Sequence, residues 1–261
     1  MTFADGAPAS YGFGLARGTE HGRAATGHGG ALRGWRSNRL HLAGERLSVV
    51  VMLNHLSDAH AALLDLLAAA LGEERVAPPL DLPPPPWCGA YADPQTGLSA
   101  RVEPASPGRV RLRFGHSPEL LDLRADGAAD NPKTRLQPTP DGLRMDRAKE
   151  NTTTLLRPAD GEPRLDAAGR YRCAELAAEL TIADAGGALY GGFSGMLGAG
   201  RMELLDPIGP DLWALPCPRA LDHTPPGDWT IAVHRDASGR ATGATVGCWL
   251  ARGLRYDRVG G

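Results

Sequence analysis

Lysine is nearly absent from this chain of 261 residues. Arginine supplies almost all of its 28 basic side chains, and only Lys133 and Lys149 are lysines. Basic residues do not outnumber the 30 acidic ones, so the chain lacks the basic excess that nucleic-acid binders usually carry. The longest uncharged stretch, residues 185–200, holds seven glycines in sixteen residues and is too short for a membrane span. We therefore expect no nucleic-acid partner and no membrane partner.

Cysteine is scarce as well, and none of it is paired at metal-binding spacing. The four cysteines are Cys88, Cys173, Cys217 and Cys248. Because no CxxC pair occurs, we expect no metal site and no cofactor. Free thiols are typical of a reducing compartment, and residues 1–10 lack the basic and apolar runs of a secretory signal. The sequence thus predicts a cytoplasmic protein.

Residues 11–72 have the pattern of an α/β unit. Leu47–Leu53 is a continuous apolar, β-branched run, which is typical of a central strand covered on both faces. Ser57 is the expected N-cap of a following helix, with Asp58 in its first turn. Gly72 suits the position just after the end of a helix.

Residues 78–86 hold six prolines and predict a linker at a domain boundary. The pattern of apolar and polar residues changes after this segment. Short alternating segments such as Arg109–Phe114 then recur at roughly 8–12-residue spacing, which predicts an antiparallel barrel or sandwich. Gly89-Ala90-Tyr91 and Gly169-Arg170-Tyr171 lie 80 residues apart, and each opens one block of such segments. We interpret the two blocks as similar modules.

Gly27-His28-Gly29-Gly30 is the segment that most strongly suggests chemistry. Glycines let a ligand approach the backbone closely, and a histidine among them can donate or accept a proton. The same residues also suit a surface hairpin, because His-Gly pairs are frequent in turns. From these residues alone, a site at the rim of a cleft and a plain turn remain open.

The order of the motifs resembles the last part of the penicillin-recognising serine hydrolases, which include class C β-lactamases. Tyr11-Gly-Phe-Gly, then His28-Gly-Gly-Ala-Leu-Arg-Gly-Trp-Arg-Ser, then Leu47–Asn54 follow one another as in that group, and His28-Gly29-Gly30 corresponds to its Lys/His-x-Gly motif. Blocks between Met202 and Arg252 are similar to the D-aminopeptidase family in particular.

The resemblance implies a mainly β fold, with a partial α/β, serine β-lactamase-like segment followed by two antiparallel β-barrel domains. Residues 1–75 would be the C-terminal part of the catalytic domain. Residues 76–160 would form one barrel, and residues 161–261 a second barrel with a loop that reaches the active site.

The resemblance also assigns roles to individual residues. His28 and Gly30 would be catalytic-site residues on an edge strand that lines the cleft, and Asp222 would bind the α-ammonium group of the substrate. The specificity loop would comprise Pro218, Arg219, Ala220, Leu221, Asp222, His223, Thr224, Pro225, Pro226, Gly227 and Asp228. Without the resemblance, these residues favour a proline-rich hairpin in which Asp222 only caps a turn.

One departure from the family pattern is large. Its Ser-x-x-Lys pair is absent, because Asp130 and Asp146 stand three residues before the two lysines, and no Tyr-x-Asn motif occurs. We therefore expect the C-terminal half of a serine D-aminopeptidase, inactive alone, that acts on small peptides or amino-acid amides. It would form a homodimer or pair with the missing catalytic half. The alternative is a non-catalytic β-barrel protein that binds peptides or docks onto a partner.

Overall fold

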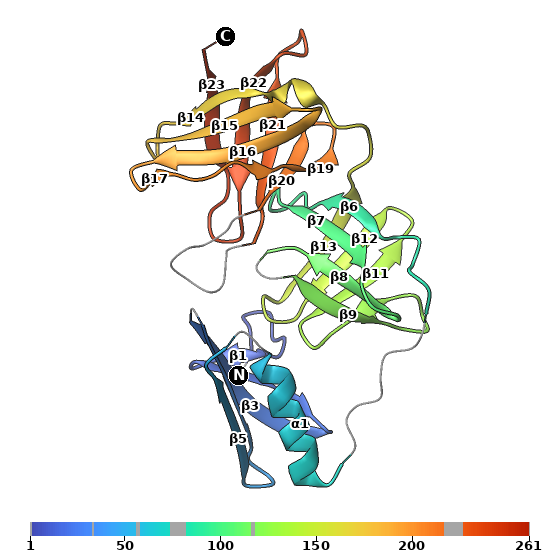
Figure 1. Ribbon diagram of the computed structural model, residues 1–261. Coiled ribbons are helices and arrows are strands. Elements are labelled where there is room, and N and C mark those ends of the chain that lie inside the picture. Colours follow the sequence, from blue (N-terminus) through green and yellow to red (C-terminus); the bar gives the residue numbers. More distant parts are fainter. Residues whose placement is uncertain are drawn as a thin grey trace.

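The computed structural model describes residues 2–32, 34–55, 58–73, 82–115, 118–216 and 227–260. Within these ranges it holds three antiparallel sheets and one α-helix. A small N-terminal sheet with the helix lies at the bottom of Figure 1, a closed barrel in the middle and a large curled sheet at the top. The described helix is not of the length and apolar character that would let it cross a membrane.

The N-terminal sheet runs in chain order. Its strands are β1 (Tyr11–Gly12), β2 (Leu15–Glu20), β3 (Arg23–Leu32), β4 (Trp35–Leu42) and β5 (Leu47–Leu53). Short turns join consecutive strands, which makes every pairing antiparallel. Helix α1 (Ala59–Leu71) covers one face, where Leu63 and Leu67 are fully buried in a cluster with Leu42, Val49 and Val51. The expected α/β unit is therefore wrong for the described residues, since no βαβ crossover joins these strands.

Within the described residues, the strand at Leu47–Leu53 is not the doubly covered central strand that the sequence predicts. The run forms β5, which pairs with β4 and lies at the end of the described sheet order. Val49 and Val51 point under α1, whereas Val50 and Met52 on the opposite face are 60% and 75% exposed. Alternation places every second residue on the other face, so a strand that is apolar on both faces can still be covered on one.

The ends of α1 match part of the prediction. Asp58, rather than Ser57, is the N-cap, and its carboxylate accepts hydrogen bonds from the amides of His60 and Ala61. Ser57 lies outside the described residues. Gly72 adopts the left-handed conformation at φ 65°, which confirms it as the residue that ends the helix.

The barrel in the middle of Figure 1 closes by ordinary neighbour pairing. Its strands are β6 (Gly89–Ala92), β7 (Ser99–Pro104), β8 (Arg109–Arg113), β9 (Glu119–Leu123), β10 (Ala129–Asp130), β11 (Thr134–Thr139), β12 (Gly142–Arg147) and β13 (Thr152–Pro158). Strand β13 pairs back with β6. The alternation at Arg109–Phe114 places Val110 and Leu112 in the fully buried interior, as the sequence predicts.

The third sheet has ten described strands. They are β14 (Gly169–Cys173), β15 (Ala178–Ala185), β16 (Ala188–Gly195), β17 (Gly198–Ala199), β18 (Glu203–Leu204), β19 (Asp206–Gly209), β20 (Leu212–Leu215), β21 (Trp229–Arg235), β22 (Ala241–Gly247) and β23 (Leu254–Val259). A 3-10 turn, η1 (Leu165–Ala167), precedes it. The last strand β23 pairs with the first strand β14, as β13 pairs with β6 in the barrel.

This sheet is curled and not a closed barrel, which corrects the expectation of two barrels. The segment 203–209 pairs first with β16 and then with β20, so it lies between the two ends of the sheet. Its pairing register shifts between Pro207 and Gly209. Leu204 is the last residue of this segment that pairs with β16 and Asp206 is the first that pairs with β20, so no described strand pairs with both ends of the sheet.

The two Gly-x-Tyr segments occupy equivalent positions. Tyr91 in β6 and Tyr171 in β14 are both buried, and each lies in the first strand of its sheet. Each hydroxyl donates to a backbone carbonyl four residues earlier, at 2.5 Å to Trp87 and 2.6 Å to Ala167. The shared local geometry supports the interpretation of two similar modules.

Candidate functional site

The His28 motif lies on β3, the middle strand of the N-terminal sheet, and not on a strand at the sheet's edge as expected. The ladder between β2 and β3 ends at the pair Ala16 and Gly27, whereas the ladder with β4 continues to Leu32. On the β2 side, the backbone of residues 28–32 therefore has no paired strand among the described residues. We call this unpaired side of residues 28–32 the open half-edge of β3.

The side chain of His28 is exposed and has a specific partner. Its Nε2 lies 2.9 Å from the hydroxyl of Tyr11, and the two ring centroids are 5.9 Å apart. The ammonium group of Lys149 lies 5.2 Å from the centroid of the Tyr11 ring, at cation–π distance. Lys149 belongs to the turn between β12 and β13 of the barrel, so the barrel contributes a charge beside the motif.

The same barrel turn, residues 148–151, holds the segment that leads into β1. The hydroxyl of Ser10 donates to the carbonyl of Ala148 at 3.3 Å, and the amide of Asn151 donates to Asp5 at 2.8 Å. Hydrogen bonds from the Ala7 amide and from Asn151 lower the pKa of the Asp5 carboxyl, which is consistent with an ionised acceptor. The N-terminal segment and the barrel therefore contact each other through several polar pairs.

The glycines of the motif differ in what surrounds them. A Cβ on Gly27 would lie 2.4 Å from the backbone oxygen of Arg39, and one on Gly30 would lie 2.5 Å from Oγ of Ser37. A Cβ on Gly29 would meet nothing closer than 3.6 Å. At Gly30, which the sequence indicates, an added Cβ would press on a side chain that can rotate. At Gly27, which the sequence does not single out, it would press on backbone.

Most of the predicted specificity loop lies outside the described residues. This applies to Pro218, Arg219, Ala220, Leu221, Asp222, His223, Thr224, Pro225 and Pro226. Strands β20 and β21 flank the loop, and Leu215 pairs with Trp229 at its base. Gly227 has a left-handed φ of 82° just before β21, a conformation that favours glycine.

The last residue of that loop is tied to the barrel. The guanidinium of Arg101 in β7 lies 3.0 Å from the carboxylate of Asp228 and 2.9 Å from that of Asp206. The hydroxyl of Thr230 accepts a hydrogen bond from the Ser99 amide at 2.8 Å. Asp228 is thus connected to the barrel through Arg101.

A tryptophan in the connection between β22 and β23 completes this interface. The ring of Trp249 packs edge-on against Phe114 at 6.0 Å. The guanidinium groups of Arg147 and Arg252 lie 5.3 Å and 5.1 Å from its centroid. Arg147 is itself nearly buried and is paired with Glu119 at 3.0 Å. Aromatic packing and compensated charge therefore join the curled sheet to the barrel.

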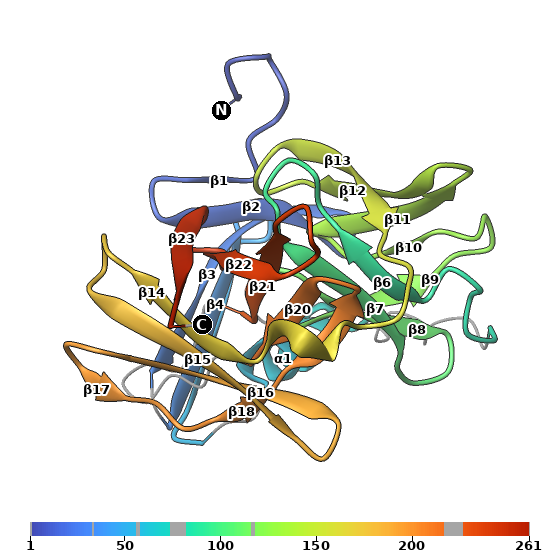
Figure 2. The same cartoon turned by 90° about the horizontal axis from the view of Figure 1, so that it is seen from above.

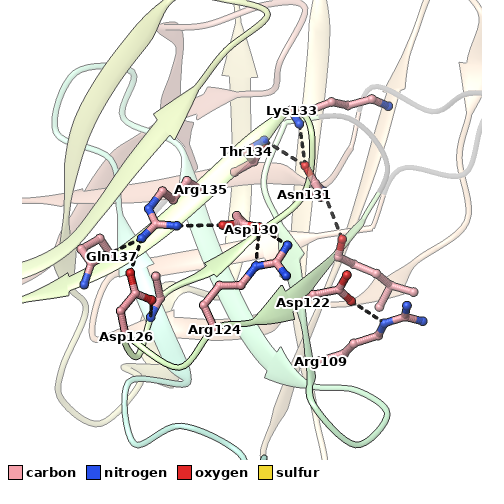
Figure 3. A network of polar contacts seen from close by, with 12 residues as sticks. Arg109, Asp122, Arg124, Asp126, Asp130, Asn131, Lys133, Thr134, Arg135 and Gln137 are labelled. Atoms are coloured by element: carbon pink, nitrogen blue, oxygen red, sulfur yellow. Dashed lines mark hydrogen bonds and ion pairs between the residues drawn. The ribbon is translucent and has the colours of Figure 1, made fainter. Parts of the chain in front are cut away.

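The other dense polar cluster lies on the barrel surface and is shown in Figure 3. Asp130 lies between Arg124 and Arg135 at 2.5 Å and 2.7 Å, and Arg135 also reaches Asp126 at 2.6 Å. Hydrogen bonds from the Ala128 amide and from Arg135 lower the pKa of Asp126. In this cluster the acids are matched by arginines. Over the described ranges, no group of three or more His, Cys, Asp or Glu side chains is placed to hold a metal ion.

Sequence reasoning identified His28 and missed both of its neighbours. Tyr11 was noted as part of a motif but given no role, and Lys149 was used only to show that Ser-x-x-Lys is absent. The two residues lie far apart in sequence from one another and meet through tertiary packing of the barrel turn on the N-terminal segment. A single sequence has no periodicity that would reveal such a pairing.

The comparisons with known proteins agree on one family. Residues 81–257 match the family model described as D-aminopeptidase, domain B. A D-aminopeptidase of Gluconobacter oxydans (strain 621H) is 53% identical over 269 residues, which cover 99% of this chain and 50% of that protein. A D-aminopeptidase of Brucella ovis is 46% identical over 259 residues, with the same two coverages. The chain thus spans about half the length of these relatives.

The crystal structure of SurE with D-Leu covers 60% of this chain and 39% of its own chain, at 22% identity and a TM-score of 0.29. At that score the likeness does not bear on the fold or on ligands.

Proposed function

Because this chain belongs to the D-aminopeptidase family, we propose that it is the substrate-recognising half of a serine D-aminopeptidase. The complete enzyme would release N-terminal D-amino acids or glycine from peptides, amides and esters through an acyl-enzyme. The chain holds no Ser-x-x-Lys and no Tyr-x-Asn, so the proposal assigns the nucleophile and its base to residues outside it. The similarity to relatives over 99% of the chain is the observation that carries it.

The open half-edge of β3 supports a role in holding the substrate. Backbone groups of residues 28–32 have no strand partner on the β2 side among the described residues, and an extended peptide can pair with such an edge. A backbone amide on that edge could also donate to an oxyanion of the acyl-transfer step. His28, exposed beside this edge, would supply a hydrogen-bonding group to the cleft.

In the proposed enzyme, Asp222 reads the free amine of the substrate. A carboxylate and an α-ammonium group form a charge-assisted hydrogen bond that an N-blocked peptide cannot make. Asp228, the last residue of the loop, is paired with Arg101 of the barrel, and Pro218, Pro225 and Pro226 would favour preorganisation of the loop over induced fit. The loop would approach the cleft from residues 161–261, the last of three proposed domains, the others being 1–75 and 76–160.

One face of the N-terminal sheet is exposed and apolar, as a surface that contacts another part of the enzyme would be. Val50 and Met52 form an exposed apolar pair on the face of β5 opposite α1, and Trp35 on β4 is 59% exposed. Contiguous exposed apolar residues mark interaction sites more often than free surface. We assign this face to contact with the catalytic half. A homodimer of the complete enzyme is compatible with this assignment.

The test is reconstitution. The chain is assayed with D-alanine p-nitroanilide alone and after co-expression with the N-terminal half of the Gluconobacter oxydans relative, which this chain does not cover. Turnover is expected only for the pair. A Val50→Lys, Met52→Lys double variant should remove both copurification and turnover, whereas Leu66→Lys, on the exposed side of α1, should preserve them.

The alternative function has its own outcome. Turnover by the chain alone that survives both His28→Ala and serine-directed inhibitors would contradict the proposed mechanism. A stable pair that binds D-alanyl peptides and hydrolyses none would favour the non-catalytic peptide-binding protein.

A further inference from the structure

We infer that Tyr11 and Lys149 are positioning residues that hold His28 as its Nδ1–H tautomer. The inference concerns the proton on the imidazole of the motif, and its consequence for substrate rests on the proposed function. It is built on the contacts that join the N-terminal sheet, the N-terminal segment and the turn between β12 and β13.

The first step is the direction of the hydrogen bond between His28 and Tyr11. The two atoms lie 2.9 Å apart, and either could carry the hydrogen as far as distance alone decides. A neutral imidazole nitrogen is a much better acceptor than a phenol oxygen, while the phenol O–H is a good donor. The favoured arrangement therefore has Tyr11 donating to Nε2. A neutral ring that accepts at Nε2 carries its hydrogen on Nδ1.

The second step is the charge over the Tyr11 ring. The Lys149 ammonium lies 5.2 Å from the ring centroid. A cation on this face draws electron density from the phenol, which makes its hydroxyl a stronger donor and a weaker acceptor. Lys149 thus favours the same direction of the hydrogen bond.

The position of Lys149 is fixed by more than its own side chain. Its turn is held to the N-terminal segment by the pairs Ser10 to Ala148 and Asn151 to Asp5. These contacts bracket Lys149 in sequence, so the turn is docked on both sides of the lysine. Lys133, the other lysine of the chain, carries the same charge but is not one of the cations that stack on a described aromatic ring.

The consequence is a defined donor at the motif. With Nε2 occupied by Tyr11, the Nδ1–H of His28 is the hydrogen that remains for an acceptor from the substrate or from the catalytic half. Tyr11 and Lys149 do not need to touch the substrate themselves. The barrel would then contribute to the cleft through one lysine, although it carries none of the motif residues.

The experiment reads the tautomer directly by NMR of the chain labelled with ¹⁵N-histidine, above the titration range of imidazole. His28→Gln identifies the His28 ring signals by their loss. A pyridine-type shift is expected for Nε2 and a pyrrole-type shift for Nδ1. Tyr11→Phe should lower the Nδ1–H to Nε2–H ratio by about fivefold, the factor for one neutral hydrogen bond. Lys149→Gln should lower it by about two- to fivefold.

Lys133→Gln is the matched control and should leave the ratio as in the wild type. A pyrrole-type Nε2 in the wild-type chain, or an unchanged ratio in a folded Tyr11→Phe variant, would overturn the inference. If Tyr11→Phe does not fold, an unchanged ratio in Lys149→Gln overturns the role of the lysine. The measurement needs no turnover, so its failure would not count against the proposed peptidase, and an inactive enzyme would not count against the tautomer.

Discussion

Gly27, Gly29 and Gly30 lie beside His28, and substitution by alanine should change the stability by a different amount at each position. Gly27→Ala should lower the free energy of unfolding by about 1–3 kcal/mol, because its Cβ would press on the backbone oxygen of Arg39. Gly29→Ala should change it by no more than about 0.5 kcal/mol. Gly30→Ala should fall between them, and adding Ser37→Ala should restore most of its loss. Urea denaturation of the four variants measures this, and equal losses at Gly27 and Gly29 would contradict it.

The proposed role of Asp222 can be tested in the complete enzyme by comparing a substrate that has a free amine with one whose amine is blocked. Truncating one member of a desolvated charge pair costs about 2–5 kcal/mol. Asp222→Ala should therefore reduce kcat/KM for D-alanine p-nitroanilide by roughly 30-fold to several thousand-fold. The loss for the N-acetyl analogue should be much smaller, because that substrate brings no charge. Equal losses on both substrates would mean that Asp222 only supports the loop.

At the scale of elements, Arg101 is the charge that joins β7 to β19 and to the start of β21. Arg101→Gln should lower the free energy of unfolding by about 1–3 kcal/mol, because it leaves the partly buried Asp206 and Asp228 without their cation. Arg111→Gln on the adjacent strand is the control, since that guanidinium is more exposed and lies 3.8 Å from Glu103. Urea denaturation compares the two, and a loss as large at Arg111 would mean that general surface charge is responsible.

The elements also show what a sequence can predict here. Strands with local alternation, such as β8, and the helix that ends at Gly72 follow from period and cap chemistry alone. The position of β5 at the end of the described sheet does not, because its apolar run gives no information on whether the second face is covered. The break in the curled sheet does not follow either, because it lies where residues 203–209 pass from pairing with β16 to pairing with β20, which is a tertiary arrangement.

The candidate site shows the same division. His28 and Gly30 could be found because they are adjacent in a motif, whereas Lys149 reaches Tyr11 only after the barrel has docked on the N-terminal segment. Motif residues can be recognised because they are close together in the sequence, whereas tertiary contacts join residues that are far apart in it. A resemblance to a family supplies roles, but not the partners that a given chain uses to orient its histidine.

The whole molecule should lose stability in alkali because its sheets bury tyrosines. Burial raises the pKa of Tyr256 from 10 to about 12. Below pH 10 the phenol is neutral in both states, and between pH 10 and 12 it ionises only when the chain unfolds. The free energy of unfolding should therefore fall across that window, by at most about 1.4 kcal/mol per pH unit for this group.

Urea denaturation in steps across this window, under reducing conditions, measures the slope. Tyr256→Phe should make the decline shallower without removing it, because burial also raises the pKa of Tyr91 and Tyr171. An identical slope in the variant would show that Tyr256 ionises without unfolding.

In the barrel and in the curled sheet the first strand pairs with the last, so the two sheets can complete their pairing only at different stages of synthesis. Seen from above in Figure 2, β14 and β23 lie together although most of the curled sheet separates them in the chain. A ribosome that has released residue 158 has supplied every strand of the barrel, which can then close. The edge of β14 has no partner until residues 254–259 emerge. An unpaired strand edge is a site at which chains misassociate. Pairing of β23 with β14 is therefore the step that removes this unpaired edge.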